Sequence, residues 1–447
     1  MTMKKQNLRY MKWIGKMIVL LFIFNFQFSI FDCSAQRVSL DECLEKALES
    51  NFSIKIIRNE ARMDKNNLNY STFLPTLEGT AKQTQTRNDT KTENSAGEVN
   101  KMSDVKTDNY TAGVALNWRI FDGLEMFTTH EKQKELLAMG ELAVQHLILN
   151  VSAAYYNVLV QHHKLMAARH SLELSNERYD EARVRYKIGN RSGLEAQQAK
   201  IDLNTDSSTY VRQKEALKSA YITLNKLMNT DLQMVNYVQD TILLGPQLVL
   251  GTLEQKTLAG NTTLLIAKKD QKISALDLKN ARAVLFPTLD FNSGYNYNKT
   301  DTPSSSTTLN RSNGFYWGFS LNVPIFSRLQ NRTKIKNAKL ELENTELSYQ
   351  EAEKETLGDL ALMYNSYENN LLMVNFEIES ASVAEANLDA ALEKYKIGSL
   401  SGIEFREFQR SYIDAVDRKL SAIYQAKVSE LSLLLLSGDI RGSFVSE

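Results

Sequence analysis

The sequence predicts a mostly helical membrane protein that carries a small antiparallel β-sheet and consists of two similar halves. Three observations lead to this class: long stretches without proline, four segments in which apolar and polar residues alternate, and motifs that recur about 210 residues apart. Only five prolines occur among 447 residues. Because proline interrupts helices, such a chain can form helices of unusual length.

The N-terminus has the composition of a secretory signal peptide. Basic residues precede an apolar run at 17–30, which is too short to span a membrane as a helix and suits a signal peptide. We expect residues 1–35 to be removed. Lipidation of Cys33 is the alternative, but Asp32 directly before it fits the lipidation signal poorly. After cleavage Cys43 is the only cysteine left, which excludes an internal disulfide.

The mature chain is a tandem repeat of two halves. The stretch YKIGNRSGLE at 186–195 returns as YKIGSLSGIE at 395–404, with seven of ten positions identical. A second pair, FLPTLEGT and LFPTLDFN, follows nearly the same spacing. The order of such pairs is kept, so we place the two repeats at 36–245 and 246–447, a unit too long for a solenoid. Each half is expected to contain helix, strand, polar loop, strand, very long helix, tip and return helix.

Four segments alternate between apolar and polar residues, the period expected of strands with one apolar face. Their aromatic faces oppose faces rich in asparagine and glycine, which suits lipid-facing barrel strands of about 10 residues. A half-buried sheet on a soluble core would show the same alternation, but no second sheet or short amphipathic helix is expected to cover so apolar a face. The strands are expected at about 76–87, 109–121, 288–298 and 314–325, and polar loops at 88–107 and 299–313.

Four strands are too few to close a barrel. The smallest single-chain barrels have about eight strands, and an open edge in lipid leaves unpaired backbone groups that cost several kcal/mol each. Several copies of the chain must therefore share one barrel. Strand counting alone allows a dimer with about eight strands, a trimer with about twelve, or a larger assembly.

Two very long helices with a heptad pattern are expected. From Leu124 to Lys187 there is no proline and one glycine, so a continuous helix would extend about 95 Å. Its apolar positions step alternately by four and three, which predicts left-handed supercoiling. One seam carries large residues and the other small or polar ones, as in a helix with a wet side in the wall of a channel. The second half repeats the pattern from Leu360 to Tyr395.

Each half also contains a tight helical hairpin. Gly189 and Gly398 stand where a helix ends, the usual position of a left-handed cap residue. Each glycine is followed by Ser-x-x-Glu, the capping box that begins a new helix. The tips lie at 187–193 and 396–402, and the boxes consist of Ser192 with Glu195 and of Ser401 with Glu404.

At these tips the sequence resembles the TolC-like outer-membrane efflux protein family. The resemblance covers nearly all of the mature chain and rests on the two Tyr-x-x-Gly-x-x-Ser-x-x-Glu tips, the Phe-x-Pro-type junctions ending at Pro75 and Pro287, and the proportions of strands and helices. It implies a homotrimer with a 12-stranded barrel in outer-membrane lipid, continued by a long α-helical coiled-coil barrel across the periplasm. It also implies that the tips dock a periplasmic adaptor (a membrane fusion protein) and an inner-membrane pump. The tip residues are Gly189, Ser192, Gly398 and Ser401.

The resemblance further implies how the periplasmic end closes. The family's acidic rings after the second tip correspond to Glu404 and Glu407, where the family usually has aspartate. Its link between hairpins corresponds to Tyr395 and Glu195. Leu400 replaces the family's basic residue, so one expected ion-pair link is missing. Helix capping also explains the two box glutamates, an exposed helical position explains Glu407, and heptad packing explains Tyr395.

Other classes of protein are disfavoured. The 53 basic and 53 acidic residues balance, which argues against nucleic acid as a partner. None of the five histidines belongs to a metal-binding motif, and there is no nucleophile elbow or phosphate-binding loop, so we expect no enzyme, metal or cofactor. The expected function is a passive outer-membrane channel for efflux or type I secretion. The alternative is a periplasmic coiled-coil adaptor without a pore, but adaptors have a single hairpin per chain and no duplicated strands.

Overall fold

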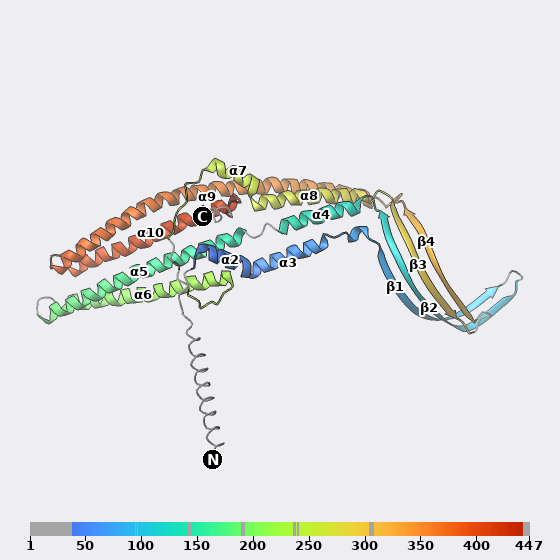
Figure 1. Cartoon of the computed structure of the whole chain (residues 1–447), viewed down its shortest axis with the longest axis horizontal. Helices are drawn as coiled ribbons and strands as arrows, with labels where there is room; N and C mark the ends of the chain where they lie inside the picture. Colours follow the sequence, from blue (N-terminus) through green and yellow to red (C-terminus); the bar gives the residue numbers. More distant parts are fainter. Residues whose placement is uncertain are drawn as a thin grey trace, which may run out of the picture. The chain divides into compact units, whose positions relative to one another are not determined.

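The computed structural model contains mostly helices and one sheet within the residues that it describes (Figure 1). The expected signal peptide at 1–35 lies outside these residues. The chain divides into two compact units, each of which takes residues from both halves of the sequence. We call 38–48, 150–244 and 371–427 the hairpin unit, and 49–149, 245–370 and 428–440 the sheet unit. The described residues are 38–93, 95, 97–140, 145–188, 193–235, 238, 241–303 and 308–440.

The sheet unit is built on four antiparallel strands. They pair in the order β1-β2-β3-β4, so the strand hairpin of the first half lies beside that of the second. Within the described residues, β1 and β4 are the edges of this sheet and pair on one side only. The strands are β1 (Thr76–Glu93), β2 (Val99–Phe121), β3 (Thr288–Asp301) and β4 (Leu309–Asn322).

The strands differ from the expected segments in three places. The polar loop expected at 299–313 is wrong at both ends, because β3 continues to Asp301 and β4 begins at Leu309. The polar loop expected at 88–107 is wrong for most of its length, because β1 and β2 continue to pair as far as Glu93 and Val99 (Figure 1). Polar residues on both faces hid this hairpin extension from an alternation argument. The fourth strand ends at Asn322 rather than 325, since Pro324 has no amide hydrogen to give to a ladder.

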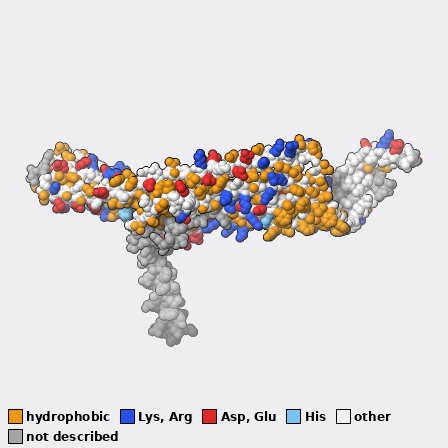
Figure 2. All heavy atoms as spheres, turned by 90° about the horizontal axis from the view of Figure 1, so that it is seen from above, with side chains coloured by type: hydrophobic (Ala, Val, Ile, Leu, Met, Phe, Trp, Pro, Cys, Tyr) orange, Lys and Arg blue, Asp and Glu red, His pale blue; other side chains and the backbone are white. Residues whose placement is uncertain are grey.

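One face of β4 consists of large, uncovered apolar side chains. The alternate residues Phe315, Trp317, Phe319 and Leu321 are 62% to 68% exposed. Figure 2 shows hydrophobic side chains gathered where the helices of the sheet unit meet the strands. An apolar face of this kind is unusual on a monomeric soluble protein and marks a surface that something else covers.

Helices of the sheet unit pack against one another through ion pairs between α4 (Glu125–Gly140) and α8 (Thr262–Ala283). The Lys132 ammonium lies 2.7 Å from the Asp277 carboxylate, and Lys269 lies 3.2 Å from Glu135. The Asn261 side chain caps the N-terminus of α8, where it accepts a hydrogen bond from the Leu264 amide at 3.1 Å. The unit also contains α3 (Phe52–Asn67), α7 (Leu250–Gly260) and the first part of α9 (Gln330–Lys396), with the short 3-10 helix η2 (Ser71–Phe73) before β1.

The hairpin unit consists of long antiparallel helices. It contains most of α2 (Leu40–Ser50), α5 (Gln145–Lys187) and α6 (Gly193–Met228), the second part of α9, and most of α10 (Gly402–Leu436). The single helix expected from 124 to 187 is represented by α4 and α5, and the residues between them, 141–144, are outside the described part of the chain.

Heptad packing is confirmed for the large seam of α9, whose members are all buried. The polar entries of the small seams do not form the wet side that the sequence suggested. Glu377 is instead paired with Arg418 of α10 at 3.0 Å, and Gln161 of α5 accepts from Gln213 of α6 at 2.7 Å. Polar side chains at these positions therefore join helices. The large seam comprises Leu360, Tyr367, Val374, Ala381, Leu388 and Tyr395.

Candidate functional site at the hairpin tips

The second hairpin stops at Gly398. This glycine has φ +78°, a conformation that strains any residue with a side chain. Its amide donates to the Tyr395 carbonyl at 3.0 Å, and the Ser399 amide donates to the Lys394 carbonyl at 2.9 Å. This pair of bonds is the Schellman motif, which satisfies the last carbonyls of α9 and turns the chain sharply.

The hairpin restarts with a complete capping box. The Ser401 amide and hydroxyl donate to the Glu404 carboxylate at 2.9 and 2.7 Å, and the Glu404 amide donates back to the Ser401 hydroxyl at 3.2 Å. These bonds, led by the backbone amide of Ser401, lower the pKa of Glu404. The carboxylate expected to form a ring is thus also the cap of α10.

The first tip is only partly described. Gly189 and Ser192 lie outside the described residues, so their predicted roles stay predictions. On either side of them, α5 ends at Lys187 and α6 begins at Gly193. A Cβ atom on Gly193 would lie 2.9 Å from the Tyr186 ring. A side chain at this position would therefore have to displace the exposed Tyr186 ring.

Tyr395 and Glu195 line the same cavity of about 330 Å³ in the hairpin unit, together with Arg178 and Asp202. The tyrosine is only 2% exposed, and its ring is stacked on Phe405 with centroids 5.3 Å apart. Within the part of the chain that the structure describes, its hydroxyl has no hydrogen-bond partner. Burial raises the pKa of Tyr395. The two residues predicted to link the hairpins are therefore brought together without a hydrogen bond between them.

The remaining gate positions differ in their surroundings. Glu407 is exposed on α10, one turn after Glu404. Leu400, which stands where the family has a basic residue, packs against a buried apolar cluster that includes Tyr395 and Phe405. At this position the chain therefore makes a hydrophobic contact.

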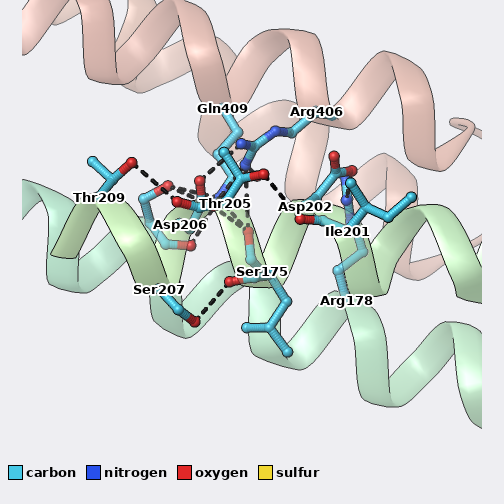
Figure 3. A network of polar contacts seen from close by, with 12 residues as sticks. Ser175, Arg178, Ile201, Asp202, Thr205, Asp206, Ser207, Thr209, Arg406 and Gln409 are labelled. Carbon is cyan, nitrogen blue, oxygen red and sulfur yellow. Dashed lines mark hydrogen bonds and ion pairs between the residues drawn. The ribbon is translucent and has the colours of Figure 1, made fainter. Parts of the chain in front are cut away.

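A buried polar network around Asp206 of α6 connects the two hairpins (Figure 3). The Arg406 guanidinium of α10 binds both of its carboxylate oxygens, at 2.6 and 2.8 Å. Ser175 of α5 donates its hydroxyl to the same carboxylate at 2.5 Å. The Gln409 amide of α10 donates to Asp206 at 3.2 Å and to the Ser171 carbonyl of α5 at 2.8 Å.

Electrostatics favour the charged form of this network. Burial alone would raise the pKa of Asp206, but the hydrogen bonds from Arg406 and Ser175 outweigh it and hold the pKa below its usual value. Asp206 and Arg406 are each less than a tenth exposed. A buried pair of this kind resists separation, because each group alone would be an uncompensated buried charge.

Arg178 of α5 makes a second connection to α10. It donates to the Gly402 carbonyl at 3.0 Å and pairs with the buried Asp202 of α6. Gln198 supports the aspartate by donating to its other oxygen at 3.1 Å. The first turn of α10, which carries Glu404, is thereby tied to the first hairpin.

The network residues were not singled out by the sequence. The sequence did contain a signal for them. Asp202 and Asp206 are four residues apart, so both lie on the same face of one helix. Arg406 also has an uncharged counterpart in the first half, Gln197, 209 residues earlier.

Within the described ranges, no group of three or more histidine, cysteine or acidic side chains is arranged to hold a metal ion. No helix among the same residues is both long enough and apolar enough to cross a membrane.

A four-stranded sheet with two open edges, two long helical hairpins and a capped second tip are the features expected from the resemblance to outer-membrane efflux channels. The family model for outer membrane efflux proteins matches residues 43–230 and 253–439. The chain therefore belongs to the outer membrane efflux protein family. Its place is the outer membrane, extending into the periplasm, and it is not an enzyme.

Similar proteins agree with this assignment. The cation efflux system protein CusC of Escherichia coli K12 is 23% identical over 332 residues, which are 71% of this chain and 70% of CusC. The outer membrane protein TolC of Vibrio cholerae is 19% identical over 335 residues, 73% of this chain and 76% of TolC. The crystal structure of the Campylobacter jejuni CmeC outer membrane channel has a TM-score of 0.74 at 18% identity, and the match covers 90% of this chain and 86% of CmeC.

Proposed function

We propose that this protein is the passive exit duct of a tripartite efflux pump or a type I secretion system. Three copies share a 12-stranded barrel in the outer membrane, and their long helices continue it as a coiled-coil barrel across the periplasm. The duct supplies no energy, so transport depends on an inner-membrane pump that reaches it through a periplasmic adaptor.

One observation carries the proposal: the sheet has two open edges. Four strands cannot close a barrel, and an unpaired edge in lipid costs several kcal/mol per backbone group. Pairing β1 of one copy with β4 of the next removes both edges at once. The apolar residues of β4, such as Trp317 and Phe319, then face lipid on the outside of the shared barrel.

The tandem repeat supports the same architecture. The family model matches the chain twice, once in each proposed half, 36–245 and 246–447. Each half supplies one strand hairpin and one helical hairpin. A trimer of such chains therefore has six similar helical hairpins around its axis, which suits a tube.

Closure of the tube is proposed to occur at the tips. Glu404 and Glu407 of three copies place six carboxylates near the axis, which attract cations and repel one another. Tyr395 and Glu195 supply one link between hairpins, since both line one cavity and the tyrosine hydroxyl faces no other described partner. The pair of Arg406 and Asp206 supplies a stronger one.

Docking of the adaptor is assigned to the outer surface of the tips. Gly398 and Ser401 shape the second tip, and Gly189 and Ser192 are expected to shape the first. The alternative of a periplasmic adaptor without a pore is disfavoured by the four-stranded sheet and by the family match.

The experiment that tests the proposal combines mass and conductance. The full chain, purified in detergent, is expected to have the mass of three copies and to form cation-selective channels in planar bilayers. A monodisperse monomer, or a trimer that never conducts, would overturn the duct.

A further inference from the structure

A row of unpaired cations follows the last strand of the sheet unit. Between Asp301 and Glu341 the sequence contains no acidic residue and six basic ones. Five of the six lie within 328–339, where α9 begins, and all five are exposed. In the described part of the chain none of these five forms an ion pair. They are Arg328, Arg332, Lys334, Lys336 and Lys339.

Large apolar side chains lie directly before these cations. Ile325 is 93% exposed, Phe326 is 76% exposed and Leu329 is 61% exposed. Figure 2 shows lysine and arginine side chains next to the hydrophobic side chains at the strand end of the helices. The order along the chain is thus an apolar strand face, an apolar turn and then cations, which is the order of layers from a bilayer core to its surface.

Three of the cations share one face of α9. Each helical residue turns by about 100°, so Arg332, Lys336 and Lys339 lie within an arc of about 60°. With a rise of about 1.5 Å per residue they span roughly 10 Å along the helix, comparable to one headgroup layer. We call these three residues the cation stripe. Lys334, although equally charged and exposed, points to the opposite side of the helix.

We propose that the cation stripe binds the phosphate groups of anionic phospholipids in the periplasmic leaflet of the outer membrane. The inference rests on the proposed lipid-facing role of the sheet, which sets the depth of the stripe. Lysine and arginine can lay their stems along apolar surface while their charged ends reach phosphate, and arginine can bind it with two parallel hydrogen bonds. Each cation beside an anionic surface strengthens binding roughly fivefold.

Native mass spectrometry of the detergent-purified full-length protein tests this proposal. The wild type is titrated with phosphatidylglycerol and, separately, with phosphatidylcholine, which has a similar size but no net charge. We expect phosphatidylglycerol to bind more tightly, and the variant Arg332→Gln/Lys336→Gln/Lys339→Gln to lose at least tenfold of that preference. Lys334→Gln is the matched control, and it should keep the wild-type preference.

The outcomes separate this inference from the proposed duct. A triple variant that keeps the wild-type preference for phosphatidylglycerol would overturn the proposal that the cation stripe binds lipid. A Lys334→Gln variant that loses as much of this preference as the triple variant would overturn it too. Displacement of the lipid by an equal concentration of inorganic phosphate would also overturn it, because the site would then bind a free anion. The same spectra report the mass of the assembly, and bilayer recordings measure its conductance. A failure of the proposed channel function would therefore be seen independently of lipid binding.

Discussion

Removal of the Arg406 guanidinium is expected to open the hairpin end of the channel. Arg406→Met keeps much of the side-chain volume but leaves the Asp206 carboxylate buried with only hydroxyl and amide donors. Breaking a buried pair from one side costs about 3–5 kcal/mol. If the substitution destabilises the closed state by about 3 kcal/mol, the ratio of open to closed channels rises roughly a hundredfold.

Single-channel recording in planar bilayers measures this ratio as the resting open fraction. The double variant Arg406→Met/Asp206→Leu removes both charges, and it should return most of the closure because no buried charge remains unpaired. Arg169→Met is the matched control. Its pair with Glu173 on α5 has a length of 3.0 Å but is exposed on both sides, so less than about 1 kcal/mol is expected.

The network also sets the pH at which closure weakens. The pKa of Asp206 is held below its ordinary value of 3.8, so its contribution to closure is fully present above that value. It is lost only as the pH falls from there through the lowered pKa. The resting leak should therefore stay constant from neutral pH to about pH 5 and rise only in stronger acid.

An Arg406→Met protein that inserts normally and leaks no more than the wild type would contradict this prediction. An Arg169→Met channel that leaks as much as Arg406→Met would contradict it equally. A double variant that still leaks a hundredfold would show that shape, rather than an unpaired carboxylate, opens the end.

The remaining predictions concern the tips and the N-terminus. Gly398→Val should uncouple efflux while leaving barrel insertion intact, because a β-branched residue at φ +78° costs on the order of 1 kcal/mol or more, and drug-resistance assays on inserted protein can test this. Glu404→Ala with Glu407→Ala should reduce cation selectivity and block by multivalent cations; unchanged selectivity would leave Glu404 as a helix cap only. The Tyr395 hydroxyl makes no hydrogen bond among the described residues, so Tyr395→Phe tests whether it bonds to Glu195 in the closed assembly: one such bond of about 1 kcal/mol predicts a leak raised about fivefold, with selectivity unchanged. N-terminal sequencing of the mature protein should begin at Gln36, and retention of residues 17–30 would contradict the signal peptide.

Local patterns predicted the elements of the fold well, because each was decided by neighbouring residues. The capping box of Ser401 and Glu404 and the positive φ of Gly398 depend on a few adjacent positions, and both were readable. Heptad burial of Leu360 and Tyr367 follows from a spacing that repeats many times. The extension of β1 and β2 was missed because polar residues on both faces give no alternation to read.

The candidate site was harder to predict, since it depends on residues distant in the sequence. Asp206 and Arg406 are 200 positions apart, and neither belongs to a motif. Their pairing follows from the way two hairpins pack, which no local pattern records. The resemblance to a family directed attention to Tyr395 and Glu195, whereas the stronger contact lies deeper in the hairpin unit.

The open edges of β1 and β4 have a consequence for the life of the protein before it reaches the membrane. A newly exported copy has to travel through water with two unsatisfied strand edges and the aromatic row from Phe315 to Phe319 uncovered. Such edges are templates for pairing with any other extended chain. Correct assembly therefore competes with aggregation, and the outcome depends on the concentration of copies that are available to pair. We therefore expect each copy to need shielding until the copies that complete the proposed barrel arrive.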